Sequence, residues 1–423
     1  MDEAWTMRCR AVDCIEVASM TSSLGRYLCA ALSVVLGCAL LILAFCSSRF
    51  AVRDWDFVVR SPWMEPWAQT WFWRGDHARF QDLDTARAVD AYWRGVGRNP
   101  LLLGGWFALA RLERQLDQGP RSDALHDFLL THAPVSTPWR WNQLLLAADR
   151  KDEARFAQAF NFVLNRQPGY RQEAVEMALG FWGEWSTILG HADCENRWTV
   201  LAECMARQAV DACIELYPLL ERDCDAILSP ARHAEFIDFL LGNKRWTEAV
   251  SAGRSAGFFR DGLVTNGHFD APVSGKAFDW RQGRAAGVEA RCEDRAGVGG
   301  GHAMHFHFLG TANLRLGHFW QYLPLLPGTT CELRFVWKAR QLGTDQGMYA
   351  EVRGVDCDGM TVRSGAITGN RDWSEESLVF DVPDQCRMAR ITFRRDESLK
   401  FDSKIRGDVW IDAVELVEKR RSR

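Results

Sequence analysis

A run of 20 uncharged residues near the N-terminus, at 27–46, constrains this chain more than any other feature. It reads YLCAALSVVLGCALLILAFC, and at 1.5 Å per residue a helix of this length spans the roughly 30 Å hydrocarbon core of a bilayer. A signal peptide has an apolar segment of only about 7–15 residues after a basic leader. The leader here, residues 1–26, contains the acids Asp2, Glu3, Asp13 and Glu16. We therefore predict a transmembrane helix over 27–46.

Two features of the N-terminus leave alternatives open. If Met20 rather than Met1 is the true start, the leader is closer to that of a signal peptide. Residues 43–46 also resemble a lipoprotein cleavage site, although Phe45 stands where a small residue is expected. The positive-inside rule does not orient the helix, because equal numbers of arginines flank it: Arg8, Arg10 and Arg26 before it, and Arg49, Arg53 and Arg60 after it.

The amino-acid composition limits which classes of protein the rest of the chain can belong to. A length of 423 residues predicts two or three domains, and 47% hydrophobic with 25% charged residues is typical of folded domains with a core. The net charge of −4 disfavours nucleic acid as a partner. Tryptophan is unusually frequent, with 19 residues, and such density serves either packing between helices or stacking on flat ligands such as sugars.

Cysteines after the apolar run fall into two groups of four. One group is Cys194, Cys204, Cys213 and Cys224, and the other is Cys292, Cys331, Cys357 and Cys386. Even numbers are compatible with disulfides in an oxidising compartment, and equally with buried free thiols. No pair has the spacing of a zinc-binding motif.

A helical region is predicted over 84–261, after a Trp-rich connector at 47–83, because apolar residues recur there at spacings of three and four. Three prolines are 34 residues apart, and small and large residues alternate around them: Pro100, Pro134 and Pro168, with Ala88, Tyr92, Gly95, Trp106, Leu109 and Ala110. This pattern resembles the tetratricopeptide repeat, in which a proline closes the second helix of each hairpin. The resemblance implies a solenoid that docks a protein partner. A plain helical bundle is the alternative.

Short alternating runs separated by Gly and Pro turns predict an antiparallel β-sandwich over 262–418, before a basic tail at 419–423. The predicted strands are 303–309, 315–323, 331–339, 348–355, 376–382, 388–394 and 409–417. The opening LVTNGHFDAP and the closing DVWIDAVELVE resemble jelly-roll carbohydrate-binding modules appended to xylanases and other polysaccharide-active proteins. That resemblance covers about 155 residues and implies a polysaccharide ligand.

Strand alternation sorts the residues of this region into two sets. One is apolar and predicts the core: Leu323, Leu325, Leu333, Phe335, Trp337, Met348, Ala350, Val352, Ala389, Ile391 and Phe393. From the other we predict a carbohydrate-binding face, with Trp320, Tyr322 and Tyr349 for stacking and Arg334, Glu351 and Arg353 for hydrogen bonds. An ordinary solvated sheet face would show the same mixture.

Metal and phosphate sites have weaker support. His302, His305 and His307 lack a Cys or carboxylate at ligand spacing, so we interpret them as surface histidines. The glycines at 297–301 precede a predicted strand with no Lys-Ser/Thr after them, which indicates a turn. Asp270 and Asp412 lie on first and last strands that pair in the resembled modules, and they are candidates for a structural calcium ion.

The sequence therefore predicts a multidomain α + β chain: an N-terminal transmembrane helix, an α-helical repeat solenoid and a C-terminal antiparallel β-sandwich of jelly-roll type. We expect no catalytic activity and no cofactor beyond calcium. The resemblances imply an accessory protein of bacterial envelope or exopolysaccharide production, anchored once in the inner membrane with most of the chain periplasmic. A polysaccharide hydrolase or lyase with an unrecognised site, and a purely structural scaffold, are the alternatives.

Overall fold

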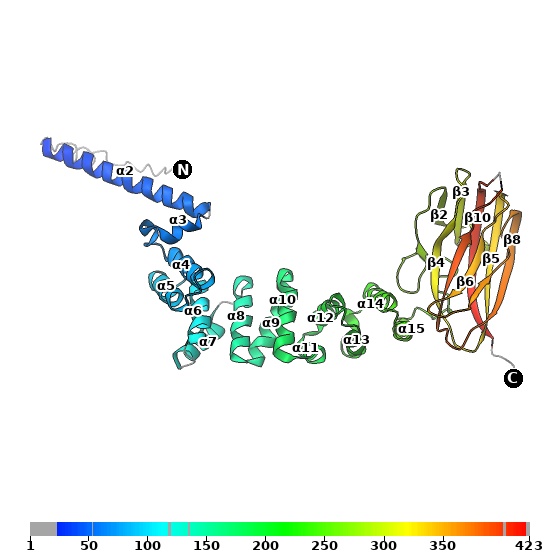
Figure 1. Cartoon of the computed structure of the whole chain (residues 1–423), viewed down its shortest axis with the longest axis horizontal. Helices are drawn as coiled ribbons and strands as arrows, with labels where there is room; N and C mark the ends of the chain where they lie inside the picture. Colours follow the sequence, from blue (N-terminus) through cyan, green and yellow to red (C-terminus); the bar gives the residue numbers. More distant parts are fainter. Residues whose placement is uncertain (1–22, 53, 117–119, 134–135, 401–402, 420–423) are drawn as a thin grey trace, which may run out of the picture. The chain divides into compact units, whose positions relative to one another are not determined.

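The computed structural model describes residues 23–52, 54–116, 120–133, 136–400 and 403–419, and Figure 1 shows the order of the elements. The chain divides into two compact units, Met1–Phe181 and Trp182–Arg423. The first contains the apolar helix and the first helical pairs. The second contains the remaining helices and the β-sandwich.

The predicted membrane segment lies within helix α2 (Ser23–Ala51). Its span Tyr27–Arg49 has a mean hydropathy of 2.8, and its most apolar 18-residue window is not buried by the rest of the protein, although Cys46 near the end of the span is buried. Leu32 and Leu41, for example, are 71% and 72% exposed. Among the described residues this is one helix long and apolar enough to cross a membrane, and a signal sequence shares these two properties.

Among the described residues of the first unit, eight further α-helices and two short 3-10 turns follow α2. Their bounds are α3 (Trp55–Arg60), η2 (Pro62–Met64), α4 (Ala68–Phe80), α5 (Thr85–Arg98), α6 (Leu103–Leu116), α7 (Pro120–His132), α8 (Thr137–Arg150), α9 (Glu153–Arg166), η3 (Pro168–Tyr170) and α10 (Arg171–Trp182), the last ending at the boundary. Helices α4, α6, α8 and α10 begin 35, 34 and 34 residues apart. Pro100 follows α5 and Pro168 follows α9, whereas Pro134 lies outside the described residues. The helical pairs begin at Ala68, inside the segment predicted as connector.

Small residues allow the helices of this unit to approach closely. A Cβ atom on Gly75 of α4 would lie 2.5 Å from the ring of Tyr92 on α5, and one on Gly105 of α6 would lie 2.8 Å from Val96. Tyr92 is fully buried, and its hydroxyl donates a hydrogen bond to Asp76 at 2.5 Å. Bulky side chains thus pack against glycines, which lets neighbouring helices approach closely.

The second unit begins with five helices: α11 (Trp185–His191), α12 (Cys194–Ala206), α13 (Val210–Cys224), α14 (Pro230–Gly242) and α15 (Trp246–Ser255), with the turn η4 (Asp225–Ile227). A disulfide joins Cys194 to Cys224, the ends of α12 and α13. Cys204 and Cys213 are buried free thiols whose sulfur atoms lie 3.0 Å apart. A second disulfide, between Cys357 and Cys386, lies in the sandwich. Both predicted alternatives for the cysteines therefore occur.

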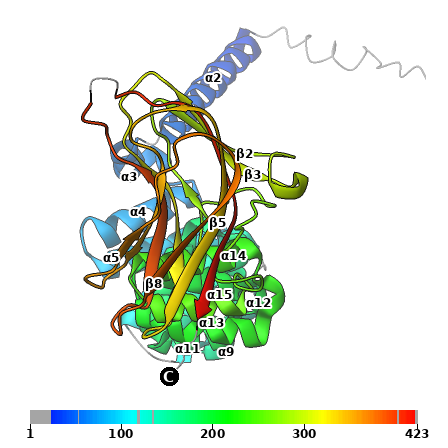
Figure 2. The same ribbon diagram turned by 90° about the vertical axis from the view of Figure 1, so that its right-hand side faces the viewer.

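Two five-stranded antiparallel sheets form the C-terminal sandwich, and strands β5 and β8 run side by side in both views (Figure 1, Figure 2). One sheet has the order β1-β4-β9-β6-β7 and the other β2-β3-β10-β5-β8. The strands are β1 (Arg281–Gln282), β2 (Val288–Glu293), β3 (Ala303–Leu309), β4 (Leu316–Pro324), β5 (Thr330–Gly343), β6 (Tyr349–Gly354), β7 (Thr361–Arg363), β8 (Gly369–Asp381), β9 (Met388–Arg395) and β10 (Arg406–Lys419), with the turn η5 (Val298–Gly300) before β3. This confirms the predicted sandwich, with three strands that the sequence analysis missed: β1, β2 and β7.

The hydrophobic core lies between the two sheets, and the predicted apolar set fills it. Each of its members is buried, from Leu323 on β4 to Phe393 on β9. Phe335 of β5 meets Phe393 edge to face at 5.4 Å between ring centroids, which joins the two sheets. Alternation along the strands therefore separates core from surface correctly.

Candidate functional site

Five of the six residues predicted to bind carbohydrate lie on the outer surface of one sheet, called here the β4–β9–β6 face. Trp320 and Tyr322 are on β4, and Tyr349, Glu351 and Arg353 are on β6, with β9 between them. Arg334 is on β5, in the opposite sheet, so its placement with the other five is wrong. Alternation separates the core side of a strand from its outer side. A sandwich has two outer sides, and this pattern does not distinguish them.

The hydrogen bonds of Arg334 explain its role on the other sheet. Its Nη2 donates to Glu332 Oε2 at 2.7 Å, and Lys419 Nζ lies 2.8 Å from the same oxygen. Ser377 donates to the other carboxylate oxygen at 2.7 Å. These three contacts, with Arg334 first, lower the pKa of Glu332 from 4.5 to about 2. Arg334 thus belongs to an ion-pair network that links β5, β8 and the end of β10.

A second network holds Glu351 on the β4–β9–β6 face. Glu351 is only 3% exposed and accepts hydrogen bonds from Arg363 Nε at 2.9 Å and Arg394 Nη1 at 2.6 Å. Beside it, the Tyr349 hydroxyl donates to Asp396 at 2.7 Å. Burial, followed by this carboxylate, raises the pKa of Tyr349 to about 12. Both oxygens of Glu351 are engaged, so this residue fixes two arginines rather than offering a free acceptor.

Trp320 and Tyr322 form the aromatic part of the same face. Their rings meet edge to face at 4.9 Å, and both residues are half-buried. The guanidinium groups of Arg281 and Arg390 lie 5.2 Å and 5.1 Å from the Trp320 ring centroid, which is cation–π distance. A ligand that stacks on the face of Trp320 would have to share or displace these cations.

Helices α14 and α15 contact the same sheet within the second unit. The Tyr322 ring lies 5.8 Å from Trp246 of α15, and Trp246 Nε1 donates to Asp356, which follows β6, at 3.2 Å. Asp238 of α14 accepts hydrogen bonds from Arg281 Nη2 and from the Ala277 backbone amide, the latter at 2.8 Å. Helices α14 and α15 therefore cover part of the face near β4. The part near β6 carries Arg353 and Arg363, which are exposed.

The two predicted calcium ligands differ in their surroundings. Asp412 is 3% exposed, and its oxygens accept hydrogen bonds from the backbone amides of Val298 at 2.8 Å and Ala413 at 2.6 Å. The Asp270 side chain is 74% exposed and lies 3.4 Å from His302 Nδ1. Asp412 holds the glycine turn before β3 in place, which agrees with the predicted turn. A calcium ion shared by these two residues remains a prediction.

His305 and His307 gain a partner that the sequence analysis did not identify. Asp408 of β10 lies opposite His307 in the strand pairing, and Glu293 of β2 lies beside His305. The carboxylate of Asp408 is about a hundred residues away along the chain, so ligand spacing could not reveal it. Burial would raise the pKa of Asp408, but hydrogen bonds from His307 and His305 outweigh it and lower the pKa.

Comparison with known proteins identifies no relative of the whole chain. No family model matches the sequence, and no curated protein matches it. Solved structures match the C-terminal sheet region. One, titled "CBM4 structure and function", is 21% identical and covers 37% of this chain and 99% of that chain, with a TM-score of 0.26.

Two other structures give similar values. TmCBM61 in complex with β-1,4-galactotriose is 15% identical, with coverage of 37% and 99% and a TM-score of 0.27. The enzymatically active domain of bacteriophage CBA120 tailspike protein 4 is 19% identical, with a TM-score of 0.28. This chain spans about a fifth of that tailspike protein, 21% of its length. Values this low assign the chain to no family.

Proposed function

We propose that this chain is a membrane-anchored, non-enzymatic protein whose β-sandwich binds a polysaccharide on the β4–β9–β6 face. The observation that carries the proposal is the combination on one sheet of Trp320 and Tyr322 with arginines that a buried carboxylate fixes. Sugars offer ring faces for stacking and hydroxyls for hydrogen bonding, and such a face has groups for both. The resemblance of the opening and closing segments to carbohydrate-binding modules supports the same ligand class.

Fixed arginines lower the entropy cost of binding a ligand on this face. Arg363 and Arg394 are held by Glu351, so part of their conformational entropy is already lost before a ligand arrives. The face carries Arg353, Arg363 and Arg390 as donors. Because these groups are cationic, polymers with carboxylate groups belong among the first ligands to test.

The remaining parts of the proposal concern location and partners. Helix α2 anchors the chain in a bacterial inner membrane, and the part after it is periplasmic, where a polysaccharide is accessible. The two disulfides support an oxidising compartment. The helical pairs of the first unit dock a protein partner, and the chain acts as an accessory to envelope or exopolysaccharide production.

Affinity electrophoresis of the full chain in a nonionic detergent tests polysaccharide binding. Each gel contains one soluble polysaccharide, either neutral or acidic. We expect the chain to migrate more slowly in at least one of these gels than in a gel without polymer. Release of reducing sugars from the same polymers is measured in parallel. Steady release of reducing sugars would show that the chain is a hydrolase and not only a binding protein. New unsaturated chain ends would show that it is a lyase.

A structural role for the sandwich is the second candidate, and the contacts with α14 and α15 favour it. Trp246 against Tyr322, and Asp238 with Arg281, use residues of the proposed face to hold helices. If no polymer slows the chain, this scaffold role is the better account.

A further inference from the structure

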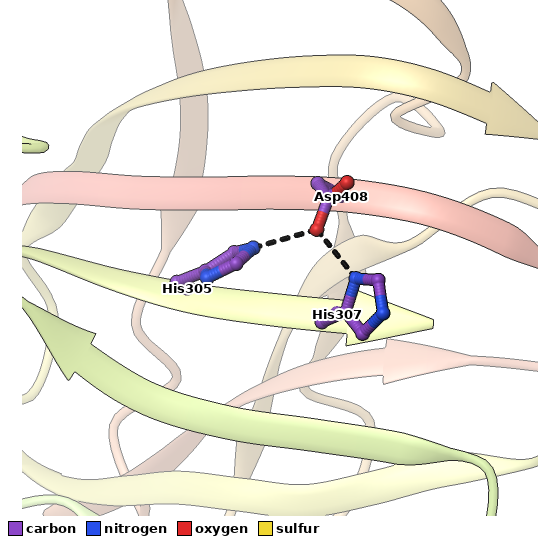
Figure 3. A group of neighbouring side chains, drawn as sticks. All are labelled: His305, His307 and Asp408. Atoms are coloured by element: carbon purple, nitrogen blue, oxygen red, sulfur yellow. Dashed lines mark hydrogen bonds and ion pairs between the residues drawn. The ribbon is translucent and has the colours of Figure 1, made fainter. Parts of the chain in front are cut away.

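On the outer face of the other sheet, two histidines and an aspartate converge. His305 and His307 project from β3, and Asp408 projects from the neighbouring β10 (Figure 3). Asp408 Oδ1 lies 2.8 Å from His305 Nε2 and 2.7 Å from His307 Nδ1. One ligand atom from each residue lies within 4.8 Å of the others, a separation that a single metal ion can bridge.

We propose that His305, His307 and Asp408 bind a Zn²⁺ ion. Two imidazole nitrogens and one carboxylate oxygen form a three-ligand set that zinc accepts in proteins, with water or another ligand in the fourth position. Calcium and magnesium prefer sets made of oxygen atoms alone, so this donor set selects against them. The site differs from the predicted calcium pair in residues and in chemistry, and it does not depend on carbohydrate binding.

The surroundings of His305 supply the outer partner that zinc-binding histidines normally have. Its second ring nitrogen, Nδ1, lies 2.9 Å from Glu293 Oε2. The two atoms are within ion-pair distance but form no hydrogen bond, so the negative charge of Glu293 acts on the ring electrostatically and favours a proton on Nδ1. With the proton on Nδ1, the lone pair of Nε2 is free to bind a metal ion. Trp410 fixes both groups, because its Nε1 donates to Glu293 at 2.8 Å and its ring stacks on His305 at 4.5 Å.

Exposure indicates where the fourth ligand would enter. The side chain of His305 is 8% exposed, whereas those of His307 and Asp408 are 45% and 26% exposed. The buried histidine is thus oriented by protein, and the other two ligands face solvent. The neighbouring strand positions carry both signs of charge, with Glu289 and Arg291 on β2 and Arg340 on β5. The electrostatic effects of these charges on a bound cation partly cancel. Binding of a cation therefore depends mainly on the three ligands.

The experiment uses the full chain in a nonionic detergent, stripped with a chelator and then titrated with Zn²⁺ against a chromophoric chelator. Other histidines and thiols can bind zinc weakly, so the result is the difference between wild type and variants. We expect Asp408→Asn and His307→Ala to lose one zinc equivalent that His302→Ala retains. Glu293→Gln should keep the ion but weaken its affinity by roughly 10–100-fold, the usual effect of an outer partner. Co²⁺ bound at this site should give visible absorption bands that disappear with Asp408→Asn.

His302 is a matched control, because it lies one residue before β3 and outside the cluster. Thermal melting in chelator checks that each variant folds, and Asp408→Asn preserves the size of the side chain if His307→Ala does not fold. Equal zinc binding by wild type and Asp408→Asn would overturn the proposal. So would variants that lower the melting temperature without changing zinc binding, because the cluster would then be only a hydrogen-bonded link between β3 and β10.

Discussion

Phe335 illustrates how much of the sandwich a single residue supports. It is 1% exposed on β5 and contacts Phe393 of the facing sheet. Phe335→Ala, or Ile391→Ala on β9, should lower the free energy of unfolding by about 2–5 kcal/mol, because each leaves a cavity in a closely packed core. Urea denaturation measures the change. Val379→Ala on β8, where the side chain is 54% exposed, is the control and should change stability by less than about 0.5 kcal/mol.

Glu332 should make the sandwich sensitive to acid. Its pKa falls from 4.5 in the unfolded chain to about 2 in the folded protein, mainly through Arg334 and Lys419. A depressed pKa stabilises the folded state above pH 4.5, and this contribution is lost as the pH falls from 4.5 to about 2.

We therefore expect the Glu332→Gln variant to be less stable than wild type at pH 6. Between pH 4.5 and about 2 it should lose less stability than wild type, because it has no carboxylate to protonate. Urea unfolding at a series of pH values measures both effects. Glu289→Gln, at an exposed position on β2, should follow the wild-type curve. Parallel curves for wild type and Glu332→Gln would show that the Arg334–Glu332–Lys419 network adds nothing to acid sensitivity.

Core residues could be predicted from the sequence, but partners across strands could not. The period of two places Leu333, Phe335 and Trp337 inside without knowledge of the fold. Arg334 and Asp408 depend on which strand lies beside which, and this follows only from the complete sheet order. The candidate zinc ligands come from strands about a hundred residues apart, so a search for local spacing misses them.

Among the elements, the packing of α4 against α5 depends on Gly75. Gly75→Ala places a methyl group against the ring of Tyr92, which Asp76 holds through a hydrogen bond. Gly97→Ala in α5 adds the same methyl group where no atom lies within 4 Å. Both changes raise helix propensity similarly, so the difference between them reports packing.

We expect Gly75→Ala to be less stable than Gly97→Ala by about 1–3 kcal/mol, the usual effect of overpacking. Thermal or urea unfolding of the full chain, followed by helical circular dichroism, measures this difference. Equal stabilities would mean that α4 and α5 do not pack as closely as the structure indicates.

Strands with a clear alternation were predictable, although the ends of long strands such as β5 and β8 were not, and the shortest strands were missed. Strand β3 was predicted with its correct bounds, because its alternation is strong over seven residues. Strands β1 and β7 have only two and three residues, too few for a pattern. Strand β2 does alternate, with Val288, Ala290 and Cys292 towards the core and charged residues outward, so its sequence contained a usable signal.

At the scale of the whole molecule, we predict one orientation of the chain across the membrane. The balanced arginines leave it open, and the proposal places everything after α2 in the periplasm. An alkaline phosphatase fused after Arg423 should therefore be active in a bacterial host, since this enzyme needs an oxidising compartment. A fusion that truncates the chain before residue 27 is the control and should be inactive. Activity confined to a cytoplasmic reporter at the same C-terminal position would reverse the topology.

The central claim is that the β4–β9–β6 face binds polysaccharide, and a comparison of two tryptophans tests it most directly. Trp320 lies on this face, and Trp373 of β8 lies on the outer surface of the opposite sheet, beside Lys338. Affinity electrophoresis of the full chain with Trp320→Ala or Trp373→Ala, in the polymer that slows wild type most, gives their dissociation constants. We predict that Trp320→Ala loses about 1–3 kcal/mol of binding free energy, as truncated aromatic anchors do, with melting close to wild type, while Trp373→Ala binds normally. Unchanged binding by a folded Trp320→Ala variant, or loss of binding with Trp373→Ala instead, would contradict the claim.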